Sequence, residues 1–344
     1  SSDLIIIGSG ISGLYISLLA KEFGQVLLLT KGNIEDCNTR YAQGGIAAAI
    51  SPEDSAELHM QDTVSAGAGV SNTEAAKILA TDGPSAIAEL VRFGITFDTD
   101  EGKISLAREG AHSTPRVLHA GGDSTGSHIE LTLASLTHES NVEVLENHTV
   151  TKILVDPISG KATGVEAINN ESGKTRVYHG HHTVIATGGA GQLFRYTTNP
   201  LVATGDGISL AYNAGAKLMD MEFYQFHPTA LHLPGAPPFL ISEAVRGEGG
   251  ILFTQNGSKF MESYHPLGDL APRDVVARAS LAEMTNDNSN YVLLDISHQS
   301  PSRITSRFPN IYQTCLHYGL DITTAPIPVA PAAHYMMGGI HTNI

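Results

Sequence analysis

The first residues of the chain combine an uninterrupted apolar run with a glycine-rich turn. Residues 4–7 are all apolar, and Gly8, Gly10 and Gly13 follow them with the spacing G-x-G-x-x-G. The next apolar side chains recur at helical intervals, at Ile11, Leu14, Tyr15, Leu18 and Leu19. The pattern therefore predicts a buried strand, a tight turn and an amphipathic helix in immediate succession.

This strand–turn–helix arrangement is typical of dinucleotide binding. Gly8 permits the tight turn, Gly10 lets backbone approach a pyrophosphate, and Gly13 lets the helix pack closely on the strand. The phosphates then lie at the helix N-terminus, where unpaired N–H groups and the helix dipole favour negative charge. A glycine turn with a purely structural role is the alternative interpretation.

Two further apolar runs bear on which dinucleotide is bound. Residues 26–29 form the second predicted strand, and it ends in Thr30, Lys31 and Gly32 without the carboxylate that holds the adenosine ribose of NAD. Residues 184–186 form another strand, which closes in small residues as expected beside a cofactor. Together they favour a flavin-dependent, two-domain oxidoreductase over a plain NAD-binding protein.

The rest of the chain alternates between helical and extended patterns. Helices are predicted over residues 73–93, 127–137, 208–214 and 273–284, and the first has Ala75, Ile78, Leu79, Ile87, Leu90 and Val91 as its apolar positions. Strands are predicted over residues 142–145, 149–155, 164–168, 176–178 and 183–186. We interpret the shorter strands as a small β-meander and the last as a return to the nucleotide-binding sheet.

Composition narrows the possible partners. The 344 residues carry a formal net charge of -15, which argues against nucleic acid or an anionic membrane surface as a partner. An anionic substrate therefore requires a local cluster of cations. Two cysteines, Cys37 and Cys315, do not form a disulfide framework and suit a cytoplasmic location. No cysteine–histidine spacing indicates a zinc site.

Five motifs follow one another along the chain. They are RYAQGGI at residues 40–46, QFHPTA at 225–230, RGEGG at 246–250, APRD at 271–274 and AAHY at 332–335. In this order they resemble the succinate dehydrogenase/fumarate reductase flavoprotein superfamily and, within it, the L-aspartate oxidase family. The resemblance covers essentially the whole chain. It implies an α/β fold with two domains. Residues 1–220 form a Rossmann-like FAD-binding domain with a β-meander insertion, residues 221–333 form a smaller α+β capping domain, and residues 334–344 return to the FAD-binding domain.

Three local details distinguish members of this superfamily. Asn38 occupies the position where the membrane-bound enzymes attach FAD through a histidine, so the resemblance implies non-covalent FAD. Glu109, between Arg108 and Gly110, resembles the segment that gives aspartate oxidases a carboxylate for the substrate's ammonium group. Ala230 after Thr229 also follows the aspartate oxidase form. All three details favour aspartate over succinate as substrate.

The resemblance also implies a set of cofactor-binding residues. These are Gly8, Ser9, Gly10, Ile11, Ser12 and Gly13 at the pyrophosphate, Lys31 near the adenosine, Asn38, Thr39, Arg40, Tyr41, Ala42, Gln43, Gly44 and Gly45 along the isoalloxazine, and Asp206 at a ribose or ribityl hydroxyl.

The substrate residues combine cations with one acceptor. Planar guanidinium groups match carboxylates, which suits Arg246 and Arg273 to a dicarboxylic amino acid. The resemblance assigns His227, Ser242 and His334 to the side-chain carboxylate, Glu109 to the ammonium group and proton transfer to Arg273. Two alternatives stay open: Arg273 as an ordinary helix-start charge, and Glu109 as the partner of Arg108 or Arg116.

The expected reaction is the oxidation of L-aspartate to iminoaspartate, with hydride passing to FAD N5 and oxygen or fumarate reoxidising the flavin. In the family this product feeds quinolinate synthase and NAD biosynthesis. A soluble fumarate reductase and a non-catalytic apo fragment are the alternatives. Relatives continue beyond the AAHY motif with a further substrate arginine, so a chain ending at Ile344 is expected to bind FAD weakly or not at all.

Overall fold

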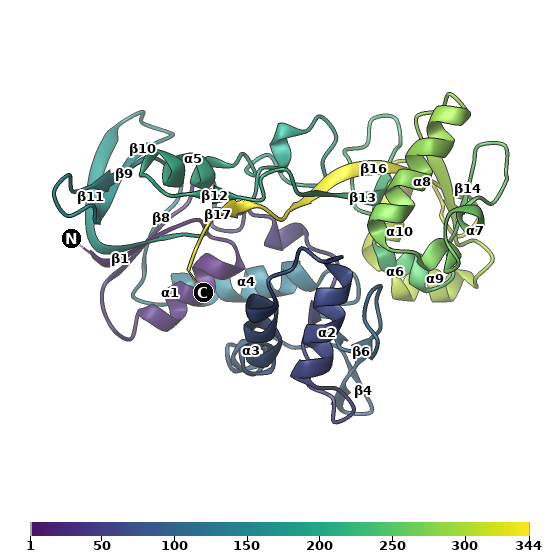
Figure 1. Cartoon of the computed structure of the whole chain (residues 1–344), viewed down its shortest axis with the longest axis horizontal. Helices are drawn as coiled ribbons and strands as arrows, with labels where there is room; N and C mark the ends of the chain where they lie inside the picture. The colour runs from purple at the N-terminus through teal and green to yellow at the C-terminus, as the bar shows by residue number, and fades with distance from the viewer. Residues whose placement is uncertain (1, 344) are drawn as a thin grey trace. The chain divides into compact units, whose positions relative to one another are not determined.

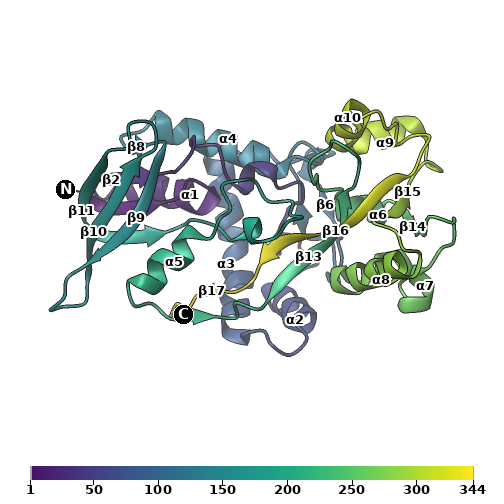
Figure 2. The same ribbon diagram turned by 90° about the horizontal axis from the view of Figure 1, so that it is seen from above.

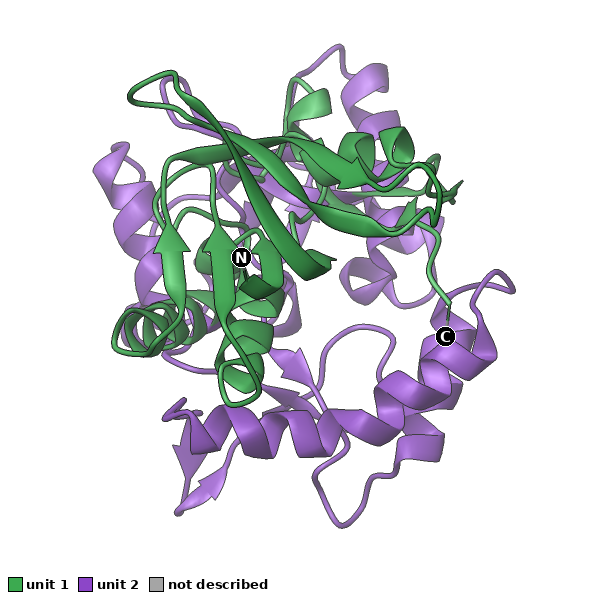
Figure 3. Cartoon of the chain, turned by 90° about the vertical axis from the view of Figure 1, so that its left-hand side faces the viewer, with its two compact units in different colours: residues 1–42, 126–225, 334–343 green, residues 43–125, 226–333, 344 purple. Residues whose placement is uncertain are grey.

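The structure, a computed structural model, describes residues 2–343 and divides into two compact units (Figure 3). Unit 1 contains the chain up to residue 42 and residues 126–225 and 334–343, and unit 2 contains residues 43–125 and 226–333. Residues 43–125, which the sequence assigns to the first domain, thus group with residues 226–333. The chain passes between the units four times.

Unit 1 is built on one six-stranded sheet. Its order is β8 (Glu143–Leu145), β2 (Val26–Leu29), β1 (Ser2–Ile7), β11 (Thr175–Ile185), β10 (Ala162–Asn169) and β9 (His148–Val155). The strands β8, β2, β1 and β11 pair in parallel, whereas β9, β10 and β11 pair antiparallel. The predicted β-meander is confirmed in β9–β11, but residues 142–145 belong to the parallel part of the sheet.

Strand β11 unites two strands that the sequence predicts separately. Its first half pairs with β10 from Thr175 to His179, and its second half pairs with β1 from Gly180 to Ile185. The expectation of a break between residues 178 and 183 is wrong because the strand continues through His181 and His182. Both side chains are exposed although they alternate between the two faces of the sheet, and exposed polar side chains do not interrupt a strand.

Helices cover the sheet of unit 1. They are α1 (Ile11–Ala20), α4 (Thr125–His138) and α5 (Asp206–Asn213), and α5 lies along β9 (Figure 2). The first residue of α4, Thr125, is counted with unit 2 and the rest of the helix with unit 1. A small sheet pairs β12 (Leu218–Met219) with β17 (Gly339–Ile340). The core packs Ile5 and Leu27 of the parallel strands against Val165 and Leu210. The α/β class and the predicted helices are confirmed.

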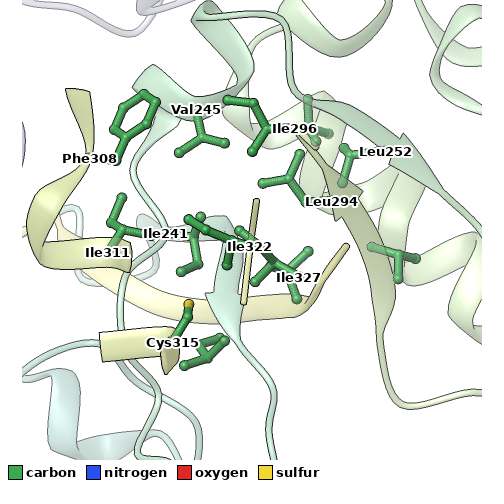
Figure 4. Close-up of a cluster of buried hydrophobic side chains, with 14 of the residues drawn as sticks. Ile241, Val245, Leu252, Leu294, Ile296, Phe308, Ile311, Cys315, Ile322 and Ile327 are labelled. Carbon is green, nitrogen blue, oxygen red and sulfur yellow. The ribbon is translucent and has the colours of Figure 1, made fainter. Parts of the chain in front are cut away.

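Unit 2 contains a second core around a four-stranded sheet. The sheet order is β13 (Tyr224–Leu231), β16 (Ile327–Met336), β15 (Val292–Asp295) and β14 (Ile251–Phe253), and the first two residues of β13 and the last three of β16 belong to unit 1. The accompanying helices are α6 (Glu243–Gly247), α7 (Met261–Tyr264), α8 (Arg273–Asn286), α9 (Pro301–Arg307) and α10 (Pro309–His317). Figure 4 shows the cluster of buried side chains, among them Val245, Phe308 and Cys315, that joins these elements.

The remaining part of unit 2 holds two neighbouring helices and short strands. They are α2 (Ala56–Ala66), α3 (Thr73–Arg92), β3 (Ile46–Ala47), β4 (Thr99–Asp100), β5 (Lys103–Ile104), β6 (Leu106–Ala107) and β7 (Val117–Leu118) (Figure 1). The predicted apolar face of α3 is wrong in part, because Ala75, Ile78, Leu79 and Val91 are exposed. The helix instead turns a face containing Ala76 and Ala80 inward, together with the predicted Ile87 and Leu90.

Within residues 2–343, no helix has the length and apolar character that a bilayer crossing requires.

Candidate functional site

The glycine turn of unit 1 is shaped by close approach of the chain to itself. Gly8 has φ +106°, and a β-carbon there would lie 2.3 Å from the carbonyl oxygen of Ala186. A β-carbon on Gly13 would lie 1.9 Å from the carbonyl oxygen of Gly8. Helix α1 therefore packs against the end of β1 as the G-x-G-x-x-G spacing predicts, and neither position accepts a side chain.

The N-terminus of α1 carries no acidic side chain that would repel an anion. Its cap residue is Gly10, which supplies no side-chain hydrogen bond, and its first turn contains no acidic residue. Thr39 accepts a hydrogen bond from the backbone N–H of Ile11 at 3.0 Å, and Ser9 donates to Thr30 at 3.0 Å. The helix dipole is thus not neutralised by a carboxylate of its own first turn, which suits a pyrophosphate.

Lys31 and Asp206 lie together in unit 1. Nζ of Lys31 is 2.6 Å from Oδ2 of Asp206, and Thr204 donates to the other carboxylate oxygen at 2.6 Å. Burial raises the pKa of Asp206, but the hydrogen bonds from Lys31 and Thr204 outweigh burial and lower that pKa. An ionised acceptor at the start of α5 is suited to a ribose or ribityl hydroxyl.

The segment expected beside the isoalloxazine contains unsatisfied acceptors. Oδ1 of Asn38 in unit 1 and Oε1 of Gln43 in unit 2 are buried and have no hydrogen-bond partner among the described residues. Gly44 has no atom within 4 Å of the position of a β-carbon. An oxidised flavin ring carries one N–H donor, which fits an acceptor such as Oδ1 of Asn38, and an amide at position 38 cannot form a covalent flavin bond. The residues present therefore fit non-covalent FAD.

The rest of this segment is held by its neighbours. Residues 39–41 form a short 3-10 helix, and Arg40 pairs with Glu35. Gly126 of α4 packs against it, since a β-carbon there would lie 1.9 Å from the carbonyl oxygen of Thr39. Tyr41 and Ala42 are exposed. In unit 2, a β-carbon on Gly45 would lie 2.2 Å from the carbonyl oxygen of Leu118.

A glutamate that the sequence analysis did not single out connects the two predicted substrate arginines of unit 2. Oε2 of Glu243 lies 2.5 Å from Nε of Arg273, and its Oε1 lies 3.6 Å from Nη2 of Arg246. The spacing SEAVR could have indicated part of this arrangement, because residues 243 and 246 share a face of helix α6. Arg273 is the first residue of α8. It also forms an ion pair with Glu243, so it is more than an isolated charge at the start of a helix.

Arg246 is fully buried. Its Nη1 donates to the carbonyl oxygen of Asp269 at 2.5 Å, while Nε and Nη2 have no hydrogen-bond partner among the described residues. Burial lowers the pKa of Arg246, the charge of Glu243 opposes this effect, and the charge of Arg273 adds to it. The three residues thus form one electrostatically coupled group.

Glu109 pairs with neither of the arginines considered from the sequence. Its Oε1 lies 3.1 Å from Nε2 of His119, while Arg108 donates to the backbone of His112. Arg116 is bound by Asp54 and Asp62 instead. Burial raises the pKa of Glu109, but the hydrogen bond and charge of His119, followed by the charges of Arg273 and His112, lower it overall. Glu109 is therefore a largely enclosed, ionised acceptor.

The loop that carries Glu109 packs directly on Glu243. A β-carbon on Gly110 would lie 2.6 Å from Oε1 of Glu243. The structure thus brings the predicted acceptor and the arginine group together within unit 2.

His227 and Ser242 also belong to unit 2. Nδ1 of the buried His227 ring accepts the backbone N–H of Thr229 at 3.2 Å, so in neutral imidazole Nε2 carries the proton and is a donor. Ser242 caps helix α6 by accepting from the backbone N–H of Ala244. A serine hydroxyl that accepts one hydrogen bond can also donate one.

His334 belongs to unit 1. Its Nδ1 is 2.8 Å from Oγ1 of Thr198, and its carbonyl oxygen accepts from Asn199 at 2.7 Å. The structure describes the two units separately, so the assembly of His334 with the residues of unit 2 stays a prediction.

Comparisons with known proteins agree with these motifs. The model of the FAD binding domain family matches residues 3–344. The chain is 48% identical to an L-aspartate oxidase of Synechocystis sp., over 99% of this chain and 62% of that protein. It is 44% identical to a chloroplastic L-aspartate oxidase of Arabidopsis thaliana, over 99% of this chain and 54% of that protein. The chain thus spans about three fifths of the length of these relatives.

Solved structures show the same fold. A mutant E. coli quinol fumarate reductase matches with a TM-score of 0.92 and 33% identity, covering 99% of this chain and 61% of that chain. A Mycobacterium smegmatis Sdh1 complex matches with a TM-score of 0.82 and 35% identity, over 99% of this chain and 60% of that chain.

Proposed function

The chain belongs to the FAD binding domain family, and from this premise we propose that its protein oxidises L-aspartate to iminoaspartate, the first step of de novo NAD biosynthesis. The identity of 48% to an L-aspartate oxidase supports this activity over that of a fumarate reductase, for which the identity is 33%. The cofactor is FAD, and when bound it supplies the two-electron acceptor.

The glycine turn and its surroundings would hold this cofactor. The open N-terminus of α1, with Ser9, Ile11 and Ser12 beside the glycines, would bind the pyrophosphate. Lys31 and Asp206 would bind the hydroxyl groups of the sugar parts, and the unsatisfied amide oxygen of Asn38 would accept from the ring N–H.

The single observation that carries the choice of substrate is the environment of Glu109. This carboxylate is largely enclosed yet ionised, and it lies within the electrostatic influence of Arg273. A site for succinate or fumarate requires only donors, because both ligands are dianions without an amine. An acceptor held beside an arginine suits a ligand with both an ammonium group and carboxylates.

The remaining residues would bind and orient the carboxylates. The Arg273 side chain is 30% exposed and can reach a ligand, whereas Arg246 is fully enclosed and would act through Glu243. His227 would donate from Nε2, and Ser242 from its hydroxyl. We assign His334 the same role as a donor. The contacts from Arg273 through Glu243 to Arg246 also suit movement of a proton at the guanidinium of Arg273.

The test uses the full-length protein loaded with FAD and kept free of oxygen. L-Aspartate is expected to bleach the visible flavin absorbance, and succinate at the same concentration is not. Oxygen and fumarate would then be compared as agents that restore the absorbance. Bleaching by succinate but not by aspartate would establish the fumarate reductase alternative, and bleaching by neither would support a non-catalytic protein.

The product has a consequence for partners. An imine hydrolyses in water, so an enzyme that consumes iminoaspartate, as quinolinate synthase does, is the expected next catalyst in the sequence of reactions.

A further inference from the structure

His119 is held rigidly next to Glu109. Its side chain is buried, and Nε2 lies 3.1 Å from Oε1 of Glu109. Its carbonyl oxygen accepts the backbone N–H of Asp98 at 2.7 Å. The carboxylate of Asp98 in turn accepts the backbone N–H groups of Gly121 and Gly122 at 2.8 and 3.0 Å. The imidazole is therefore attached to a chain segment fixed on both sides.

The other histidine of this region is committed elsewhere. Nδ1 of His112 lies 3.1 Å from Nη1 of Arg116, and its ring packs against that of His59 with centroids 5.9 Å apart. Arg116 itself binds Asp54 and Asp62. Among the described residues, the hydrogen bond to the Glu109 carboxylate thus comes from His119.

We infer that His119 is a positioning residue that determines the preference for a substrate carrying an ammonium group, by holding Glu109 as a fixed, ionised acceptor. This inference rests on the proposed function. A buried carboxylate without a donor takes up a proton, and a protonated Glu109 does not balance the charge of an ammonium group. The hydrogen bond from Nε2 stabilises the charged form.

Glu109 keeps room for a ligand in this arrangement. A carboxylate has two oxygens with about four lone-pair positions, and His119 engages one of them. The Glu109 side chain is also 19% exposed, so part of it is reachable. His119 therefore fixes the orientation of the carboxylate and leaves it able to accept further hydrogen bonds.

The experiment compares two ligands in the full-length FAD-loaded protein and in its variants. For L-aspartate, the concentration dependence of the anaerobic flavin-reduction rate gives an apparent Kd. For succinate, the change in the spectrum of oxidised flavin gives a Kd. In His119→Leu we expect the Kd for aspartate to rise at least about tenfold, as for loss of a hydrogen bond to a charged group. The Kd for succinate is expected to stay within about twofold of the wild-type value, since succinate has no ammonium group for Glu109.

Two further variants show whether His119 acts through Glu109. His119→Gln places an amide donor near the position of Nε2 and is expected to restore most of the affinity for aspartate. In a Glu109→Gln background, His119→Leu is expected to have no additional effect, because the carboxylate it supports is gone. His317→Leu, an exposed position of α10, is the matched control and should bind both ligands as the wild type does.

The outcomes separate the two proposals. An equal loss of affinity for aspartate and succinate in His119→Leu would show a general structural role and overturn the inference, as would an unchanged Kd for aspartate or a full effect in the Glu109→Gln background. Failure of aspartate to reduce the wild-type flavin would instead overturn the proposed function.

Discussion

A β-carbon added to Gly110 would lie 2.6 Å from Oε1 of Glu243, so these two residues couple the loop of Glu109 to the arginine group. Glu243 is not free to yield, because its other oxygen is held by Arg273 at 2.5 Å. The proposed acceptor for an ammonium group and the proposed donors for carboxylates are therefore in direct contact.

The first prediction concerns Gly110→Ala. The new methyl group would displace Glu243 from its arginines, and turnover of L-aspartate is expected to fall at least about tenfold. Folding stability is expected to fall by about 1–3 kcal/mol, because the buried Arg246 loses its counter-ion. Steady-state kinetics and thermal unfolding measure the two effects. Gly247→Ala is the control, since a β-carbon there meets no atom within 4 Å. Equal turnover in both variants would contradict the coupling.

The second prediction concerns Glu243→Gln. The amide keeps the shape but removes the charge between Arg273 and Arg246, so turnover is expected to fall about 100-fold, as for loss of a group that takes part in proton transfer. FAD content, measured by absorbance, should not change. The control is Asp274→Asn, next to Arg273, because Asp274 pairs with the exposed Arg278. Wild-type turnover in Glu243→Gln would remove Glu243 from the mechanism.

The third prediction concerns the buried cation of unit 2. Arg116 is fully enclosed and binds both oxygens of Asp54 at 2.9 Å and one oxygen of Asp62. Arg116→Met would leave a buried carboxylate without its partner, and a loss of about 3–5 kcal/mol in the free energy of unfolding is expected. Denaturant titration measures this loss. The exposed Arg92→Met is the control, and a similar, small effect in both would show that the enclosed pair contributes little.

The fourth prediction concerns a buried acid on α4. Glu130 is fully enclosed, and neither of its oxygens has a hydrogen-bond partner of ordinary geometry among the described residues. Burial raises its pKa from 4.5 to about 8, although the Cys37 thiol and the charge of Arg40 act to lower it. Between these pH values the folded protein retains a proton that the unfolded chain releases, so this group's effect is to reduce stability as the pH rises.

Glu130→Gln removes this dependence. As the pH rises from 5 to 8, the free energy of unfolding of the variant is expected to increase relative to that of the wild type by up to about 3 kcal/mol. Urea unfolding at the two pH values measures the difference, with the exposed Glu139→Gln as control. Parallel pH profiles for wild type and Glu130→Gln would show that Glu130 is ionised in the folded protein.

The local pattern was sufficient to predict the main helices and strands of unit 1, but not the short strands β12 and β17 or all of the strand pairing. The close packing at Gly13 was predicted correctly because its contact, Gly8, lies only five residues away, whereas the contact of Gly8 with Ala186 depends on the pairing of β1 with β11. The continuity of β11 was missed because its exposed polar positions, His181 and His182, resemble a turn when only composition is considered.

The types of residue in the candidate site were likewise readable from the chain, whereas their partners were not. The sequence left open an ion pair between Glu109 and Arg116. In the structure Arg116 instead pairs with Asp54 and Asp62, which lie far away in the sequence. Glu109 forms a hydrogen bond with His119, and Glu243 lies between Arg246 and Arg273.

The sequence by itself determined the strand–glycine–helix nucleotide motif, the family to which the motifs belong and the types of side chain that we propose bind a dicarboxylic amino acid. Only the tertiary structure decided which acidic side chain pairs with which basic side chain. The physical reason is that a motif depends on backbone geometry over neighbouring residues, whereas a charge pair depends on which distant segments fold against each other and exclude water from the space between them.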